Sequence, residues 1–231
     1  MHVHRIIMLV TALGSGLATA GPLAAQVTSA DEGSFALLRA GERMGREDFS
    51  IRSAPSATGP ILVAQGTVVI GTRRIKPGLN TDTSGAVLRY QNEVRSEGRV
   101  QESYSGQVTR DHYAARVLRD DGESLREFRL PPGTVVVDDD VCHQLWFVAR
   151  RGAGARVPVL APRRNVIETI VIELIGLETL GIDVQEFAVR HLRLRTEETG
   201  VMREVWMDDR GRILKVAMPA QQLVALREDI R

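Results

Sequence analysis

Apolar and polar residues alternate with a period of two through much of the chain, most clearly between residues 187 and 218. Within this segment Leu192 and Leu194 fall on one side of an extended chain, and Arg193 falls on the other. An Asp-Asp-Arg-Gly sequence at 208–211 separates the second and third alternating runs. Half-buried antiparallel strands joined by turns show this pattern, so we predict a three-stranded meander here.

Similar alternation predicts strands in the first half of the chain. Residues 34–53 indicate an opening hairpin, and residues 61–70 indicate a strand that bends at its central glycine. Residues 86–130 predict a second meander, in which Asp121 and Gly122 form the strongest short hairpin signal of the chain.

Three further segments carry mixed signals. Residues 71–85 are polar and rich in turn formers, so we expect a surface connection. Residues 141–150 follow an aspartate that can cap a helix, and their apolar spacing fits a short helix, although a strand is the alternative. Residues 167–181 fit either a helix or a strand, and their β-branched content favours a strand.

Strands at intervals of roughly a dozen residues, with turn residues between them, indicate an all-β fold with a minor α component. We expect a curved antiparallel sheet or open half-barrel of about 10–12 strands in meander order. A short helical plug around residues 141–148 would cover part of its groove. Residues 26–231 form a single β-rich domain in this prediction.

The N-terminus has the features of a secretory signal peptide. Arg5 precedes an apolar run at 6–17, and small residues follow that run. The run is too short and too rich in glycine for a comfortable membrane span, and a retained anchor helix is the alternative. Cleavage would follow Ala20 or Ala25. We prefer Ala25, which assigns residues 1–25 to the signal peptide and places the mature chain in the periplasm or outside a bacterial cell.

Composition narrows the classes of partner. Hydrophobic residues make up 43% of the chain, an ordinary value for a globular protein. Cleavage after Ala25 would remove one of the 30 basic residues and none of the 29 acidic residues, which leaves a net charge near zero. A neutral chain offers no electrostatic basis for binding nucleic acid. The one cysteine, Cys142, excludes an internal disulfide, so stability must come from the core.

No residue pattern indicates catalysis or metal binding. Asp138, Asp139 and Asp140 lack the alternating spacing of a calcium loop, so we expect a solvated turn that caps the next element. Cys142 adjoins His143, but side chains of sequence neighbours do not face each other, so we expect a buried, inert thiol. These patterns predict no catalytic residue, no metal, no cofactor and no enzymatic activity.

A curved sheet can line an apolar groove with its larger side chains. The candidates are one aliphatic and four aromatic residues: Leu88, Tyr90, Trp146, Phe147 and Trp206. Filling of the core by the aromatic side chains is the alternative, and an aromatic content of only 4% argues against a surface that stacks sugars or bases.

Three stretches resemble a group of exported bacterial proteins with a domain of unknown function. The segment 203–216 is similar to their closing hairpin, with its V-W-x-D-x-x-G-R-L-L pattern, and 157–164 and the G-x-x-x-F-x-I pattern within 42–51 are similar to the same group. That group is similar in fold to periplasmic lipoprotein carriers and receptors of the LolA and LolB type, an unclosed β-barrel wrapped over short helical segments. The resemblance implies a lipid or other apolar ligand by analogy of fold, and it implies no catalytic residues.

The function predicted from the sequence is non-enzymatic binding of a lipid, lipoprotein or other apolar ligand by an exported envelope protein. The first alternative is a structural or assembly module that binds another envelope protein. A hydrolase is third, since it would need His112 or His143 within hydrogen-bond reach of Cys142 or a carboxylate. No membrane span is expected after signal cleavage.

Overall fold

A computed structural model describes residues 27–110 and 112–230, so the predicted signal peptide lies outside the described residues. The described chain contains the helix α1 (Leu145–Ala149), the 3-10 helix η1 (Pro219–Gln221) and fifteen strands. The strands are β1 (Thr28–Arg39), β2 (Glu42–Ala54), β3 (Ile61–Ile70), β4 (Arg73–Thr81), β5 (Val87–Ser96), β6 (Arg99–Thr109), β7 (His112–Arg119), β8 (Gly122–Arg129), β9 (Val135–Val136), β10 (Arg156–Ala161), β11 (Val166–Ile182), β12 (Gln185–Thr196), β13 (Met202–Asp208), β14 (Ile213–Met218) and β15 (Leu223–Arg227).

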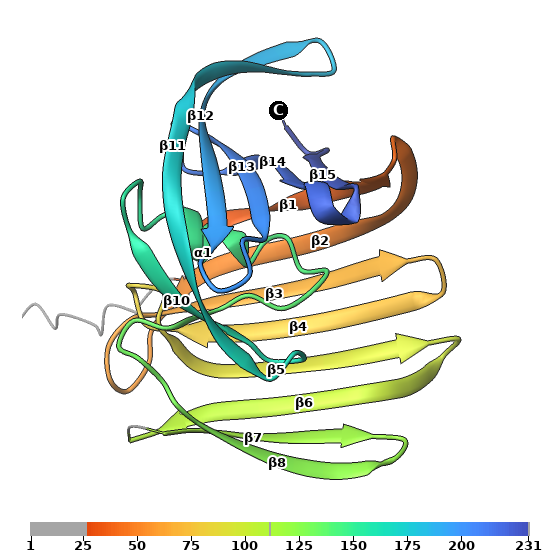
Figure 1. The fold of residues 1–231 in the computed structure, drawn as a ribbon, viewed down its shortest axis with the longest axis vertical. Coiled ribbons are helices and arrows are strands. Elements are labelled where there is room, and N and C mark those ends of the chain that lie inside the picture. The colour runs from red at the N-terminus through yellow and green to blue at the C-terminus, as the bar shows by residue number, and fades with distance from the viewer. Residues whose placement is uncertain (1–26, 111, 231) are drawn as a thin grey trace, which may run out of the picture.

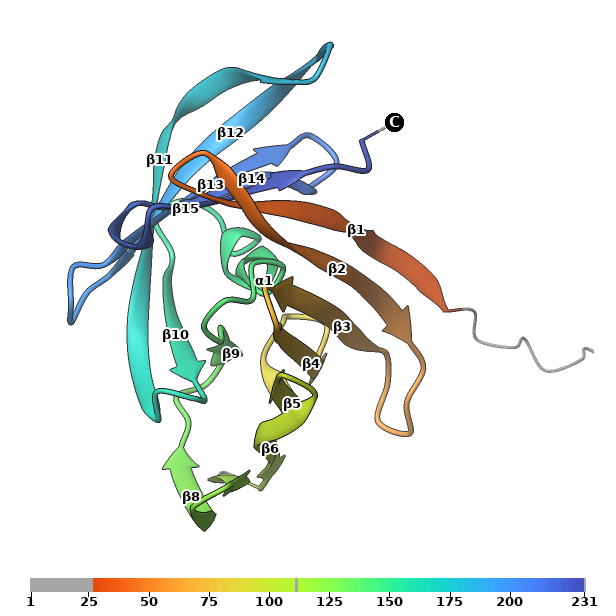
Figure 2. The same cartoon turned by 90° about the vertical axis from the view of Figure 1, so that its right-hand side faces the viewer.

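All fifteen strands belong to one sheet, in the order β8-β7-β6-β5-β4-β3-β2-β1-β15-β14-β13-β12-β11-β10-β9. Neighbouring strands are antiparallel throughout, apart from the parallel pair β9 and β10. The sheet coils on itself, so that β10 and β11 face β2 and β3 across α1 (Figures 1 and 2). The predicted curved, unclosed antiparallel sheet with a helical plug is therefore confirmed.

Two contacts hold the coil in shape. Pairing of β1 with β15 joins the N-terminal and C-terminal halves into one sheet, with Phe35 opposite Arg227. At the other end β8 and β9 are the two edge strands and do not pair with each other. The Arg126 side chain on β8 donates a hydrogen bond of 2.8 Å to the Pro162 carbonyl beyond β10, so the free edge lies against the opposite half.

Residues 137–149, which are buried apart from the half-buried Asp139 and Asp140, fill the space between the two halves. All five residues of α1 are buried. The carboxylate of Glu47, on β2, is fully buried and accepts hydrogen bonds from the backbone N–H groups of Cys142 at 2.8 Å and His143 at 3.0 Å. Its Oε1 also lies 2.5 Å from His143 Nδ1. Glu47 therefore fixes this plug to the wall of the sheet.

Asp138 fixes the start of the plug. Its carboxylate accepts hydrogen bonds from the Tyr90 hydroxyl at 2.7 Å, the Asn92 amide at 2.8 Å and Arg163 Nε at 2.9 Å. Asp138 is only 3% exposed, so the predicted solvated turn is wrong at this residue. A run of acidic residues looks like surface in sequence, but a buried carboxylate is tolerated where an arginine and other donors satisfy it. The predicted aspartate cap is also wrong, because α1 begins after Gln144 and has no side-chain cap.

Residues 71–85 do not form the expected surface connection, because most of them form β4. Ile75, Pro77, Leu79 and Thr81 are buried, and the residues between them are less buried, which is the alternation of a strand. With β4 and the short strands β9 and β15, the sheet exceeds the expected 10–12 strands. The strands expected at 187–218 and at 167–181 and the short helix within 141–150 are all confirmed.

Candidate ligand-binding pocket

The hairpin of β11 and β12 extends past the body of the sheet and curls over β13, β14 and the C-terminus (Figure 1). A β-bulge between Leu174 and Gly176 shifts the alternation of β11. Beyond this bulge Leu177 pairs with Arg190, and Thr179 pairs with Ala188. These side chains lie on the same face of the sheet as the main core, but nearer the tip of the hairpin, where no residue of the plug covers them.

A pocket of about 430 Å³ opens on this face of the hairpin. It is lined by residues of β11, β12 and the end of β13, namely Leu177, Glu178, Thr179, Ala188, Val189, Arg190, Met207, Asp208 and Asp209. Leu177 is 79% exposed and the neighbouring Leu174 is 50% exposed, whereas Met207 at the base is buried. An apolar base beneath exposed leucines is a hydrophobic surface that a ligand would cover.

Charges lie at the edge of this pocket. The described structure places no carboxylate within ion-pair distance of Arg190, whose side chain donates a hydrogen bond of 3.5 Å to the Met207 sulfur. Asp208 is engaged by the Arg212 side chain and backbone N–H, each at 2.8 Å. The pocket therefore combines an apolar base with a cation that is available to a ligand.

The opposite face of the hairpin is fixed to the sheet by Trp206. Its indole N–H donates a hydrogen bond of 2.9 Å to Glu178, whose other carboxylate oxygen lies 2.7 Å from His191 Nδ1. The rings of Trp206 and His191 stack with centroids 4.2 Å apart, and the Lys215 ammonium lies 4.3 Å from the centre of the indole ring. Hydrogen bonds from Trp206 and His191 lower the pKa of Glu178. This cluster holds the hairpin in its curled position.

The predicted groove residues do not form one site. Tyr90 is fully buried on the inner face and bonds Asp138, whereas Leu88 is 38% exposed. On a regular strand two residues that are two positions apart share a face. Here the pairing of β5 with β4 shifts by one residue where Thr81 pairs with Val87, so Leu88 and Tyr90 do not share a face. Trp206 lies in a smaller apolar cluster with Ile182, separate from the main core.

Trp146 and Phe147 of the plug lie together, with ring centroids 5.0 Å apart. The Trp146 indole N–H donates a hydrogen bond of 3.0 Å to the Gly211 carbonyl, and Arg150 lies over the ring. Both aromatic residues line a small pocket of about 170 Å³ beside Gly85. They act mainly as core residues of the plug, since Trp146 is 4% and Phe147 2% exposed.

His143 does lie within hydrogen-bond reach of a carboxylate, that of Glu47, and both residues are buried. Burial, together with the nearby Glu47 carboxylate, raises the pKa of the Cys142 thiol. His112 lies at the start of β7, far along the sheet order from β2. The Glu47 and His143 pair joins the plug to the sheet, and it has no contact with the hairpin pocket.

The sequence alternation missed Leu177, Arg190 and Met207 as pocket residues. The available signal was the length of the apolar run at 167–181, which continues past the glycine at 176 with no partner segment to cover it. In the described residues no helix is long and apolar enough to cross a membrane, and no group of three or more histidine, cysteine, aspartate or glutamate side chains is placed to hold a metal.

No family model matches the sequence, and no curated protein matches it. A crystal structure of a β-barrel-like protein of the domain of unknown function DUF1849 from Brucella abortus is similar, with a TM-score of 0.54 and 10% identity. The alignment covers 89% of this chain and 97% of that chain. A DUF1089 family protein from Pseudomonas aeruginosa aligns over the same shares, with a TM-score of 0.37 and 16% identity. The first comparison supports a β-barrel-like fold shared with a domain of unknown function.

Proposed function

We propose that this chain is an exported, non-enzymatic protein of the bacterial envelope that binds a lipid through the hairpin pocket. The observation that carries the proposal is the exposed apolar side chain of Leu177 above the buried Met207. The space inside the coiled sheet is unsuited to this role, because α1 and the rest of the plug occupy it. The ligand therefore binds beside the plug and leaves it in place.

The pocket has the size and character of a small-molecule site. Its volume of about 430 Å³ falls within the range of roughly 300–1,000 Å³ that is usual for ligand pockets. Full burial of one leucine side chain contributes about 1.5–3 kcal/mol. Because Leu177 is 79% exposed, most of this contribution is still available to a bound apolar chain.

Arg190 gives the pocket a preference for an amphiphile with an anionic end. Its guanidinium has no carboxylate partner among the described residues, so a carboxylate or phosphate on the ligand would form a charge-assisted hydrogen bond. Asp209 also lines the pocket and disfavours an anion beside its own carboxylate. The anionic end of the ligand would therefore lie toward Arg190.

Binding of a dansyl-labelled undecanoic acid to the mature protein tests the proposal. We expect Leu177→Ser to weaken the binding about tenfold, since loss of about 1.5 kcal/mol of apolar contact corresponds to that factor. The matched control is Leu125→Ser on the edge strand β8, where the leucine is 77% exposed and far from the pocket. Equal effects of the two variants, or no binding by the native protein, would refute a lipid site at the hairpin.

The methyl ester of the same probe tests the role of Arg190. The native protein should bind the acid more tightly than the ester, and Arg190→Gln should remove that difference without weakening ester binding. An acid preference that survives in Arg190→Gln would place the anionic end elsewhere.

A second function, binding of another envelope protein, is favoured by Val184 in the turn between β11 and β12. Its side chain is 98% exposed, so it offers nothing to the fold. Loss of a specific partner from envelope extract with Val184→Ser, while fatty-acid binding stays intact, would favour this function over lipid binding.

A further inference from the structure

A second pocket lies at the other end of the inner face of β12 and β13. It measures about 380 Å³ and is lined by Asp139, Asp140, Arg164, Glu168, Thr196, Thr199, Val201, Arg203 and Gln221. These residues come from the plug, from the strands β11, β12 and β13, from the β10–β11 and β12–β13 connections and from η1. Core residues Leu192, Leu194 and Val205 separate it from the hairpin pocket.

Arg203 is the unusual residue of this pocket. Strand alternation gives it the same inward direction as Val205 and Met207, which belong to the core. It is only 9% exposed, and its Nη1 donates a hydrogen bond of 3.3 Å to the Thr196 hydroxyl. Among the described residues no carboxylate lies within ion-pair distance of its guanidinium. A buried cation of this kind normally has a partner.

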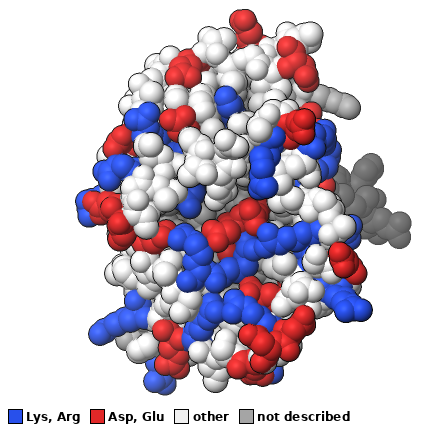
Figure 3. All heavy atoms as spheres, turned by 45° about the vertical axis from the view of Figure 1, so that its right-hand side comes forward, with Lys and Arg blue, Asp and Glu red and all other residues white. Residues whose placement is uncertain are grey.

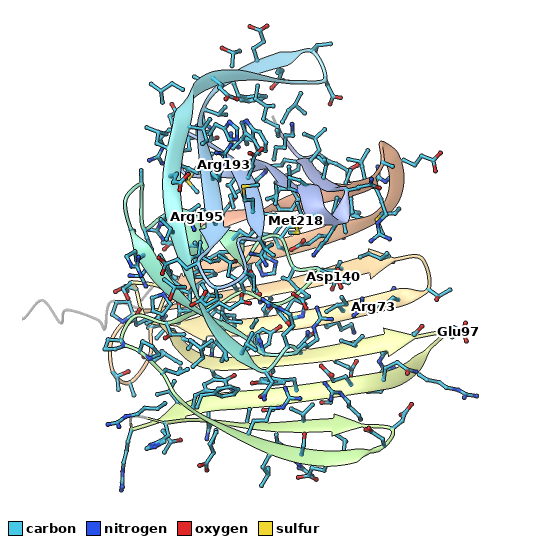
Figure 4. All side chains as sticks on the ribbon, in the orientation of Figure 1. Arg73, Glu97, Asp140, Arg193, Arg195 and Met218 are labelled. Carbon is cyan, nitrogen blue, oxygen red and sulfur yellow. The ribbon has the colours of Figure 1, made fainter. Side chains whose placement is uncertain are left out.

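The acidic residues around the pocket are engaged by other arginines. Arg164 pairs with Glu168 at 2.5 Å and with Asp139 at 3.3 Å. Arg73 pairs with Asp140 at 2.8 Å, and the two side chains lie next to each other in Figure 4. Figure 3 shows acidic and basic side chains mixed across the middle of this face, between the two halves of the sheet.

Because these carboxylates pair with other arginines, Arg203 is the basic residue of the pocket that forms no ion pair. Burial lowers its pKa, and the nearby Arg164 lowers it further. A lining guanidinium that has no ion pair, beside the hydroxyls of Thr196 and Thr199, has the chemistry that holds a planar carboxylate or a phosphate oxygen.

We propose that this second pocket binds a small ligand through one oxyanion group, a carboxylate or a phosphate, held by Arg203 and the hydroxyl of Thr196. Asp139 and Asp140 at the rim disfavour a ligand with many negative charges and favour one whose remainder is neutral or cationic. The site is separate from the lipid pocket, so its occupancy does not depend on the proposed lipid function.

Thermal unfolding with added anions tests this site. Sodium acetate and inorganic phosphate are titrated separately at constant ionic strength, with sodium chloride as the balancing salt. We expect the unfolding temperature of the native protein to rise with at least one of them. A rise with acetate alone assigns a carboxylate ligand, a rise with phosphate alone assigns a phosphate ligand, and no rise with either overturns the proposal.

The variant Arg203→Met separates binding from a structural role. Because it removes a buried cation without an ionic partner, it should be at least as stable as the native protein in chloride and should lose the response to the anion. Arg195→Met, on the outer face of β12, should keep that response. A response that persists in Arg203→Met, or a large loss of its stability in chloride, would contradict the proposal. Unchanged binding of the dansyl probe by Arg203→Met shows that the lipid pocket is intact.

Discussion

We expect Glu47→Ala to lower the free energy of unfolding more than almost any other single substitution. Its carboxylate lies inside the molecule and satisfies three donors of the plug, namely the N–H groups of Cys142 and His143 and the imidazole Nδ1 at 2.5 Å. Among the described residues no other carboxylate bonds these atoms. Glu47→Ala would leave buried polar groups without partners and a cavity where the side chain was.

The expected cost follows from these contacts. Removal of one partner from a buried, hydrogen-bonded pair costs about 3–5 kcal/mol. For a chain of this size the free energy of unfolding falls by about 2 kcal/mol per M of urea. A cost of about 4 kcal/mol therefore lowers the urea midpoint of unfolding by about 2 M. Loosening of the plug should also expose the Trp146 indole, which bonds the Gly211 carbonyl.

Urea unfolding followed by tryptophan fluorescence measures this effect. The control is Asp48→Ala, at the next residue on the opposite face of β2, where the carboxylate pairs with Arg46 at 2.8 Å on the surface. Exposed pairs of this kind contribute at most about 1 kcal/mol. A Glu47→Ala midpoint no lower than that of Asp48→Ala would refute the role of Glu47 as the anchor of the plug.

Three further outcomes are expected. Cys142 is fully buried and its thiol pKa is raised by burial, so a thiol reagent should label it only after denaturation; rapid labelling of the native protein would contradict the structure. Gly66→Ala should destabilise the protein by about 1–3 kcal/mol, because the added Cβ would lie 2.8 Å from His143 Cε1, and an unchanged urea midpoint would refute this contact. The pKa of Glu178 is lowered below its ordinary 4.5, so its contribution to stability is present above pH 4.5 and is lost as pH falls through the lower folded value. In an NMR titration of the Glu178 side-chain carboxyl carbon the midpoint should therefore lie below pH 4.5, and a midpoint at or above that pH would be inconsistent with this lowered pKa.

Hairpins and faces were predictable from sequence where the signal is local. Asp121 lies in the turn between β7 and β8 and Gly122 begins β8, and the alternation around Leu192 gives β12 its buried and exposed sides. The pairing of β1 with β15 had no such signal, because it joins residues about 190 positions apart along the chain. Sequence alternation also states which residues share a face without stating which face lies inside.

The candidate site was less predictable, because it too depends on which face of the sheet lies inside and on contacts between distant segments. Trp206 and Met207 lie on opposite faces of β13, and only the coiling of the sheet decides that Met207 joins the main core. Bulges then change the face of single residues, as at Leu88, and a proline such as Pro77 is accommodated inside β4 where its missing N–H breaks the ladder with β3. Buried charges are the hardest to foresee, since the burial of Asp138 depends on three donors from two distant segments, β5 and the β10–β11 connection.

The location of the bound lipid tests the central proposal most directly. A fatty acid with a nitroxide label on its chain can be added to the isotope-labelled protein, and the loss of amide signals then maps the residues near the label. We predict strong broadening at Leu177, Ala188 and Met207, with little change at Leu145 and Phe147 of α1. Broadening centred on α1, with the hairpin signals unchanged, would show that the ligand enters the coiled sheet by displacing the plug and would contradict the hairpin site.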